Sequence, residues 1–268
     1  MRTRLHRAAP LTLVGPPDFA RQIECRLNSY TWNLLDSSSI DFRLKVLEFD
    51  GERFIAAADF SAQKAFRRSD CAPTQYGSGV VLHEENLAVE AVALDHGTPS
   101  LGFALRQGLR VNVWRTALDE MGLPIGEWLT ETKRAVVRGE RDDHLVEVPE
   151  RGRISLGRLK EKVLRLQRGQ VLAYVTGAAD TEENRRKIIA LADGADQLFI
   201  ETPFLHLDRA LARQTNHLTA RAAAEIAAVA HARSVVGFHY SQRYADDPRV
   251  LERELQDSLD SCRAVRSA

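Results

Sequence analysis

The chain has 268 residues, of which 44% are hydrophobic and 28% are charged; these proportions are typical of a globular protein with a sizeable core. Its 37 Lys and Arg balance 37 Asp and Glu, so the net charge gives no argument for nucleic-acid binding. The three cysteines are widely spaced, which argues against a disulfide framework, and no apolar run approaches the ~20 residues of a membrane helix. We therefore expect a cytoplasmic protein with no membrane contact.

The first half of the chain is predicted to consist mostly of strands. Leu11–Val14 is a short apolar strand that Gly15-Pro16-Pro17 ends, and a helical pattern follows from Asp18 to about Leu35. Asp50-Gly51 is a hairpin signal between two alternating segments. The predicted strands after Leu35 are Phe42–Phe49, 52–60, Gly79–His83, Leu87–Leu94, Leu101–Leu105 and Leu109–Val113.

The second half alternates helices and strands. Helices are predicted at Arg115–Met121, at 126–139, from Asp180 or Thr181 to Gly194, from Thr219 to about Ala232, and over Asp247–Val265. Buried strands are predicted at 170–176, 196–204 and 234–240. This order predicts one α/β or α+β domain spanning residues 1–268.

The segment Lys133–Arg168 is dense in charge, with eleven Lys and Arg against six Asp and Glu. Such a segment is typical of a solvated helix face. A basic excess also suits contact with a phosphate backbone, which dominates nucleic-acid affinity. The sequence leaves both interpretations open.

Four ionisable residues stand at the ends of predicted buried strands or beside a helix start. His96 follows "VEAVALD", Glu201 follows "DQLFI", His239 follows "VVGF", and His217 lies just before the helix that Thr219 begins. Open sheets place their active sites outside such strand ends. Each residue alone also suits a solvated strand end, and strand order cannot be read from spacing.

Several common catalytic signatures are absent from the 268 residues. There is no G-x-x-x-x-G-K-[ST] phosphate loop, no G-x-G-x-x-G between strand and helix, and no G-x-S-x-G nucleophile turn. Nucleotide-binding and Ser-His-Asp hydrolase classes are therefore poorly supported.

Five segments in order resemble the metallo-β-lactamase-fold hydrolases, specifically those like ribonuclease Z, the tRNA 3′-end endonuclease. The first segment resembles the family's strand followed by Gly-Pro, and the second resembles its histidine motif followed by a Ser-Leu-Gly-aromatic run. The third resembles the strand that carries a functional glutamate. The last two resemble the family's later histidine motifs. These segments are "LTLVGPPDF", "LDHGTPSLGFAL", "ADQLFIETPF", "NHLTARAAAEIA" and "FHYSQRY". The similarity runs from about Leu11 to Tyr244.

The resemblance implies an αβ/βα sandwich of two mixed sheets flanked by helices, with two zinc ions at one edge. His96 and His239 are then zinc ligands, and two zinc ions activate a water for attack on a phosphodiester. His217, oriented by Glu201, is the proton donor to the leaving 3′ oxygen. Ser241 and Arg243 in the last motif are candidate substrate-binding residues. The implied substrate is a tRNA precursor or another phosphodiester.

The sequence departs from this family pattern in two places. The family signature H-x-H-x-D-H is absent, since no two histidines are separated by one residue. Gly177 stands where the family has a metal-bridging aspartate, and Asp180, three residues on, is a substitute metal ligand or a helix N-cap. We hypothesise an N-terminally incomplete family member, through a misplaced start codon or gene decay, that lacks the opening strands and metal loop.

Two functions follow for test. The first is a ribonuclease Z-like zinc-dependent phosphodiesterase whose activity the missing motif impairs. The alternative is a catalytically inactive protein of the same fold that acts as a binding or interaction subunit. A missing sheet edge exposes unpaired strands and apolar surface, which favours a homodimer. Zinc content is expected to separate the two functions.

Overall fold

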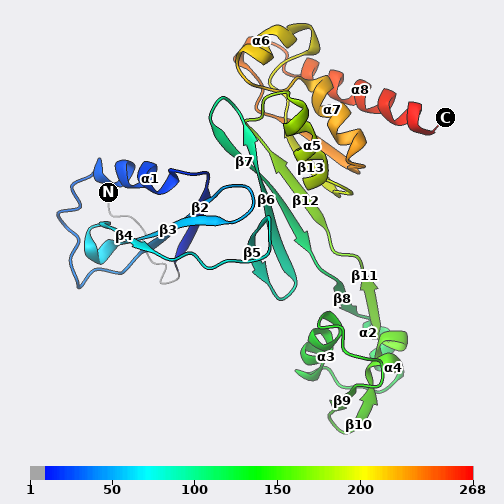
Figure 1. Cartoon of the computed structure of the whole chain (residues 1–268). Helices are drawn as coiled ribbons and strands as arrows, with labels where there is room; N and C mark the ends of the chain where they lie inside the picture. Colours follow the sequence, from blue (N-terminus) through cyan, green and yellow to red (C-terminus); the bar gives the residue numbers. More distant parts are fainter. Residues whose placement is uncertain (1–9, 268) are drawn as a thin grey trace. The chain divides into compact units, whose positions relative to one another are not determined.

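The computed structural model describes residues 10–267, and residues 1–9 and 268 lie outside the description. The chain divides into two compact units. Unit 1 contains the described residues up to Leu82, Val89–Ala104, and the chain from Val171 onward, whereas unit 2 contains His83–Ala88 and Leu105–Gln170. Figure 1 labels most of the helices and strands of the two units.

The first sheet of unit 1 has four strands in the order β1-β2-β3-β4. Strands β1 and β2 are parallel, while β3 is antiparallel to both of its neighbours. The bounds are β1 Leu11–Gly15, β2 Arg43–Phe49, β3 Phe54–Ser61 and β4 Arg68–Cys71, with helix α1 at Phe19–Asn28 and the short helix η1 at Ala62–Lys64. Gly51, at φ 108°, provides the positive φ for the predicted hairpin between β2 and β3.

Helix α1 starts at a buried carboxylate of the neighbouring strand. Glu48 of β2 is 8% exposed and accepts hydrogen bonds from the backbone N–H groups of Asp18 (3.0 Å) and Ala20 (2.9 Å). These are N–H groups that a helix leaves unpaired at its start. The predicted helix to Leu35 is wrong in its second half, because the helix ends at Asn28 and Trp32 has a φ of 49°.

The second sheet has the strand order β14-β13-β12-β7-β6-β5. Helices α5, α7 and α8 pack with β12, β13 and β14 around the largest apolar cluster. The strands are β5 Val80–Glu84, β6 Leu87–Asp95, β7 Pro99–Gln107, β12 Val171–Val175, β13 Gln197–Glu201 and β14 Ser234–Phe238. The helices are α5 Glu182–Leu191, α6 Arg209–Gln214, α7 Ala220–Val229 and α8 Arg249–Ser267, with short helices η2 His206–Asp208 and η3 Gln242–Tyr244. These mixed sheets and helices confirm the predicted α/β class.

Parallel pairing brings three strand ends to one edge of this sheet. Val175 is opposite Ile200, and Ile200 is opposite Gly237. The loops that follow β12, β13 and β14 therefore leave the sheet side by side. This edge is where α/β proteins bind their ligands.

Unit 2 has its own apolar core, made by residues from Leu118 to Leu164. It contains two antiparallel ribbons, in which β8 Arg110–Val113 pairs with β11 Leu164–Gln167 and β9 Leu145–Val148 pairs with β10 Gly152–Ser155. Its helices are α2 Arg115–Glu120, α3 Trp128–Val137 and α4 Leu156–Lys162. The charge-dense segment Lys133–Arg168 is therefore not one solvated helix face, because it spans parts of two helices and three strands.

None of the described helices combines the length and the apolar character that crossing a membrane requires.

Candidate active site

The centre of the site is the side chain of Glu201, the last residue of β13, which is fully buried. Its Oε2 accepts a hydrogen bond from the backbone N–H of Gly177 (2.5 Å). Its Oε1 accepts from the N–H groups of Leu218 (3.2 Å) and Ala178 (3.5 Å). A buried carboxylate requires such donors. Glu201 thus fixes the loop after β12 and the start of the α7 segment to the sheet edge.

Two histidines contact the same carboxylate. His217 Nδ1 lies 2.9 Å from Oε1, and His239 Nδ1 lies 3.4 Å from Oε2. The His217 side chain is 16% exposed and that of His239 is 49% exposed, so the pair lies at the boundary between core and solvent. Asn216 and His239 have φ angles of 58° and 65°, in the left-handed region that non-glycine residues adopt mostly at turns and functional sites.

His96 lies in the turn between β6 and β7, next to the other two histidines. Its ring centroid is 4.5 Å from that of His217, which is 5.2 Å from that of His239. Its Nδ1 lies 2.6 Å from the carbonyl oxygen of Asn216. His96, Glu201, His217 and His239, which the sequence places at separate strand ends, therefore lie together at this edge of the sheet.

The His96 turn is held by Asn184 of α5, a residue that the sequence analysis did not identify. The Asn184 side chain accepts from the N–H of Asp95 (3.0 Å) and donates to the carbonyl oxygens of Asp95 (2.7 Å) and Ala179 (2.9 Å). It is 1% exposed. In the sequence, Asn184 stands among charged residues in "EENRRK", a pattern that also suits a solvated helix face. The sequence therefore gives no signal that this side chain is buried.

The donor set suits a metal ion in its chemistry. Each of the three imidazoles has Nδ1 against an oxygen atom, from Glu201 or from the Asn216 carbonyl, and an Nδ1–H donor leaves a lone pair on Nε2. This is the hydrogen bonding that orients metal-binding histidines. Within residues 10–267, the one group of three or more metal-ligating side chains with atoms within 4.8 Å of one another is Glu201, His217 and His239, so His96 lies outside that group.

Asp180, the candidate metal ligand, and Ser241, the candidate substrate-binding residue, both have partners within the protein. Asp180 Oδ1 lies 2.5 Å from Arg185 Nε, and Thr181, not Asp180, caps α5 by accepting from Asn184 N–H. The predicted cap role of Asp180 is therefore wrong, because the hydroxyl one residue later fills it. Ser241 caps η3 by accepting from Arg243 N–H.

Arg243 contacts Asp208, with Nε 3.4 Å from Oδ2. The same carboxylate accepts a short hydrogen bond from the Tyr244 hydroxyl, which in turn accepts from the N–H of Leu205. Burial and the bond to Asp208 raise the pKa of Tyr244. The segment after β14 is thereby joined to η2.

Gly177 lies against His96. A Cβ added at Gly177 would be 3.4 Å from His96 Cδ2, and Gly177 has a φ of 59°. Its carbonyl oxygen accepts from the Ser100 hydroxyl at 2.5 Å. The position that aligns with the motif aspartate thus lies against His96 and supplies only backbone groups.

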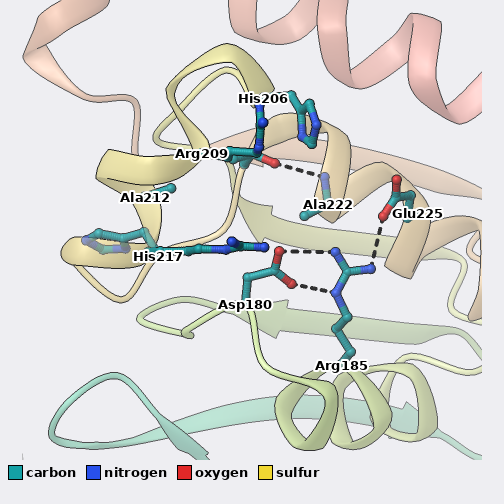
Figure 2. Close-up of a pocket in the computed structure, with 10 residues that line it drawn as sticks. Asp180, Arg185, His206, Arg209, Ala212, His217, Ala222 and Glu225 are labelled. Atoms are coloured by element: carbon teal, nitrogen blue, oxygen red, sulfur yellow. Dashed lines mark hydrogen bonds and ion pairs between the residues drawn. The ribbon is translucent and has the colours of Figure 1, made fainter.

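A small cavity lies beside His217 (Figure 2). Asp180 faces the guanidinium of Arg185, which also contacts Glu225 at 3.0 Å. The hydrogen bond to Asp180 and the contact with Glu225 raise the pKa of Arg185. His206 of η2 also lines this cavity.

No protein-family model matches the chain. Curated relatives do match it, among them three proteins named "Ribonuclease Z". The protein of Deinococcus radiodurans is 29% identical over 260 residues, covering 95% of this chain and 74% of the relative. That of Streptomyces avermitilis is 34% identical (72% and 60%), and that of Natronomonas pharaonis is 30% identical (67% and 54%). The chain thus spans only part of each relative.

Among solved structures, human tRNase Z, short form, is similar at 14% identity and a TM-score of 0.43, over 88% of this chain and 63% of that protein. The metallo-β-lactamase fold protein YhfI from Bacillus subtilis is similar at 10% identity and a TM-score of 0.38, over 68% and 46%. The sequence matches confirm the resemblance that the five motifs predict. The chain is a homologue of the ribonuclease Z proteins.

Proposed function

We propose that the chain is a ribonuclease Z-like, metal-dependent phosphodiesterase that cleaves RNA at the 3′ end of tRNA precursors. The observation that carries the proposal is the fully buried Glu201 carboxylate with His217 on one oxygen and His239 on the other. The homologous ribonuclease Z proteins support the choice of substrate.

In this proposal His217 protonates the leaving 3′ oxygen as the P–O3′ bond breaks. The proton comes from Nε2 of the imidazolium, while Nδ1–H remains hydrogen-bonded to Glu201 Oε1 at 2.9 Å. The Glu201 carboxylate fixes the orientation of the His217 ring, as general acid catalysis requires. The hydrogen bonds from Gly177 and Leu218 hold that carboxylate in place.

His96 and His239 would hold the metal through Nε2, because their Nδ1 atoms face oxygens. When bound, such an ion supplies a water that is activated at neutral pH and stabilises charge on the phosphate. Among the described residues, the donor atoms close enough to share one ion belong to Glu201, His217 and His239, so His96 lies outside that group, and Gly177 contributes no carboxylate for a second ion.

The test combines metal analysis by mass spectrometry with cleavage of a tRNA precursor that carries a 3′ trailer. His96→Ala and His239→Ala are expected to lower metal content and activity together. His217→Ala is expected to lower activity at least ~100-fold and to leave metal content unchanged. If His217→Ala removes the metal as well, His217 is a ligand and its assignment as the acid is wrong.

His231→Ala is the matched control. Its Nδ1 lies 3.5 Å from the carboxylate of Asp193, but both side chains are about 70% exposed. It therefore shares the histidine–carboxylate pairing and lacks the burial, so metal content and activity are expected to equal those of the wild type.

The alternative function is an inactive binding protein, and Gly177 at the aspartate position favours it. A folded, purified chain that holds no metal and cleaves neither a tRNA precursor nor bis-p-nitrophenyl phosphate would establish this alternative and overturn the proposed phosphodiesterase.

A further inference from the structure

The cavity beside His217 contains positive charge that the proposed reaction does not use. Arg209 and Arg213 both line it and stand four residues apart on α6. Both are exposed. Within the described part of the chain, neither guanidinium has an ion pair or a hydrogen-bond partner. Like charges at this spacing on a helix repel each other, so no described protein group offsets the repulsion between the two arginines.

The acidic groups around these arginines are already engaged. Asp180 and Glu225, the two carboxylates that line the cavity, are both paired with Arg185. Asp208, the residue before α6, contacts Arg243 and Tyr244. Three arginines and two carboxylates line the cavity, so the local excess is one guanidinium charge, next to His217.

The size of the cavity limits what it can admit. Its volume is about 40 Å³, which is room for a few water molecules or one small anion and too little for a nucleobase. Guanidinium groups bind phosphate oxygens through paired, charge-assisted hydrogen bonds. Both the charge and the size indicate a phosphoryl group.

We propose that Arg209 and Arg213 bind a phosphate of the RNA strand adjacent to the scissile one. This inference rests on the proposed function, because His217 lies on the wall of the same cavity. It assigns to α6 the task of positioning the strand so that the leaving 3′ oxygen meets His217.

The test measures binding of a short, fluorescently labelled single-stranded RNA by anisotropy, under metal-free conditions that prevent cleavage. The double variant R209A/R213A is expected to bind about tenfold more weakly, and its salt slope is expected to fall by about 0.7 for one lost phosphate contact. R209K/R213K keeps the charges and is expected to retain most of the affinity. The matched control is Arg186→Ala, an exposed arginine of α5 that does not line the cavity.

Neutral methylphosphonate linkages, introduced one at a time, then locate the contact. In the wild type one linkage next to the cleavage position is expected to weaken binding, and in R209A/R213A the same linkage is expected to have no further effect. Equal affinity and salt slope in the wild type, R209A/R213A and Arg186→Ala would overturn the inference, as would additive losses at every linkage.

A separate measurement keeps the inference distinct from the proposed function. If the wild type binds no RNA, the RNA assignment fails together with the proposed substrate. Inorganic phosphate, followed by ³¹P line broadening, then reports on the anion site alone: broadening that R209A/R213A abolishes supports it, and equal broadening in both proteins contradicts it.

Discussion

Replacing Glu201 by Gln is the most informative single change to the site, because it keeps the shape of the side chain and removes one acceptor oxygen. In either orientation of the new amide, its NH₂ group, which is itself a donor, faces a buried N–H donor. On the Oε2 side it meets the N–H of Gly177, and on the Oε1 side it meets those of Leu218 and His217. At least one buried N–H therefore loses its acceptor.

The magnitude follows from those contacts. An unsatisfied buried donor costs about 1–3 kcal/mol, and each hydrogen bond to a charged group contributes about 1.5–3 kcal/mol. We expect Glu201→Gln to lower the free energy of unfolding by about 3–5 kcal/mol, a large part of the ~5–15 kcal/mol of a typical domain. Urea denaturation measures the change.

Glu48→Gln is the matched control, since Glu48 is also a buried strand carboxylate that accepts from two backbone N–H groups. It is expected to lose about 2–4 kcal/mol without any effect on the histidines. Glu201→Gln is also expected to change the ¹⁵N shifts of the His217 ring, because Nδ1 no longer faces a carboxylate. A stability within about 0.5 kcal/mol of the wild type would refute the hydrogen-bonding role of Glu201.

Three further outcomes are expected. Asn184→Ala leaves the backbone groups of the His96 turn without partners and should lower the free energy of unfolding by about 2–4 kcal/mol in urea denaturation; a smaller metal content than in the wild type should accompany it. Gly177→Ala should cost about 1–2 kcal/mol because of the positive φ, and a loss below 0.5 kcal/mol would contradict that backbone conformation. Burial, and then Glu252, raise the pKa of Tyr240 to about 12 from 10.0. Its stabilising contribution is therefore complete below about pH 10 and is lost as the pH rises toward 12, so the stability of Tyr240→Phe should decline less over that interval.

The strand ends of the candidate site could be predicted from sequence because each follows an apolar run. "DQLFIE" and "VVGFH" show where a buried strand stops, and the polar residue after the run must lie at the sheet edge. That Glu201 and His239 meet depends on strand order and register, with Ile200 opposite Gly237. Neither order nor register is encoded in local periodicity, and here the five ordered motifs supplied them.

Other features depend on contacts that no local pattern reports. The buried Glu48 cap on α1 and the Asn184 bridge to the His96 turn join residues 28 to 89 positions apart. The sequence does not predict the strands within Lys133–Arg168, because β9 and β10 have only four residues each, too few for a clear alternation. The arginines of α6 also gave no signal, since an Arg pair on a short helix is common on protein surfaces.

The separate apolar core of unit 2 has a consequence for local unfolding and for sequence variation. That core consists of residues between Leu118 and Leu164. We therefore expect amide hydrogen exchange in this core to report a local unfolding free energy different from that of the strands that hold Glu201. Changes in the length or sequence of unit 2 are therefore expected to leave the histidine cluster intact.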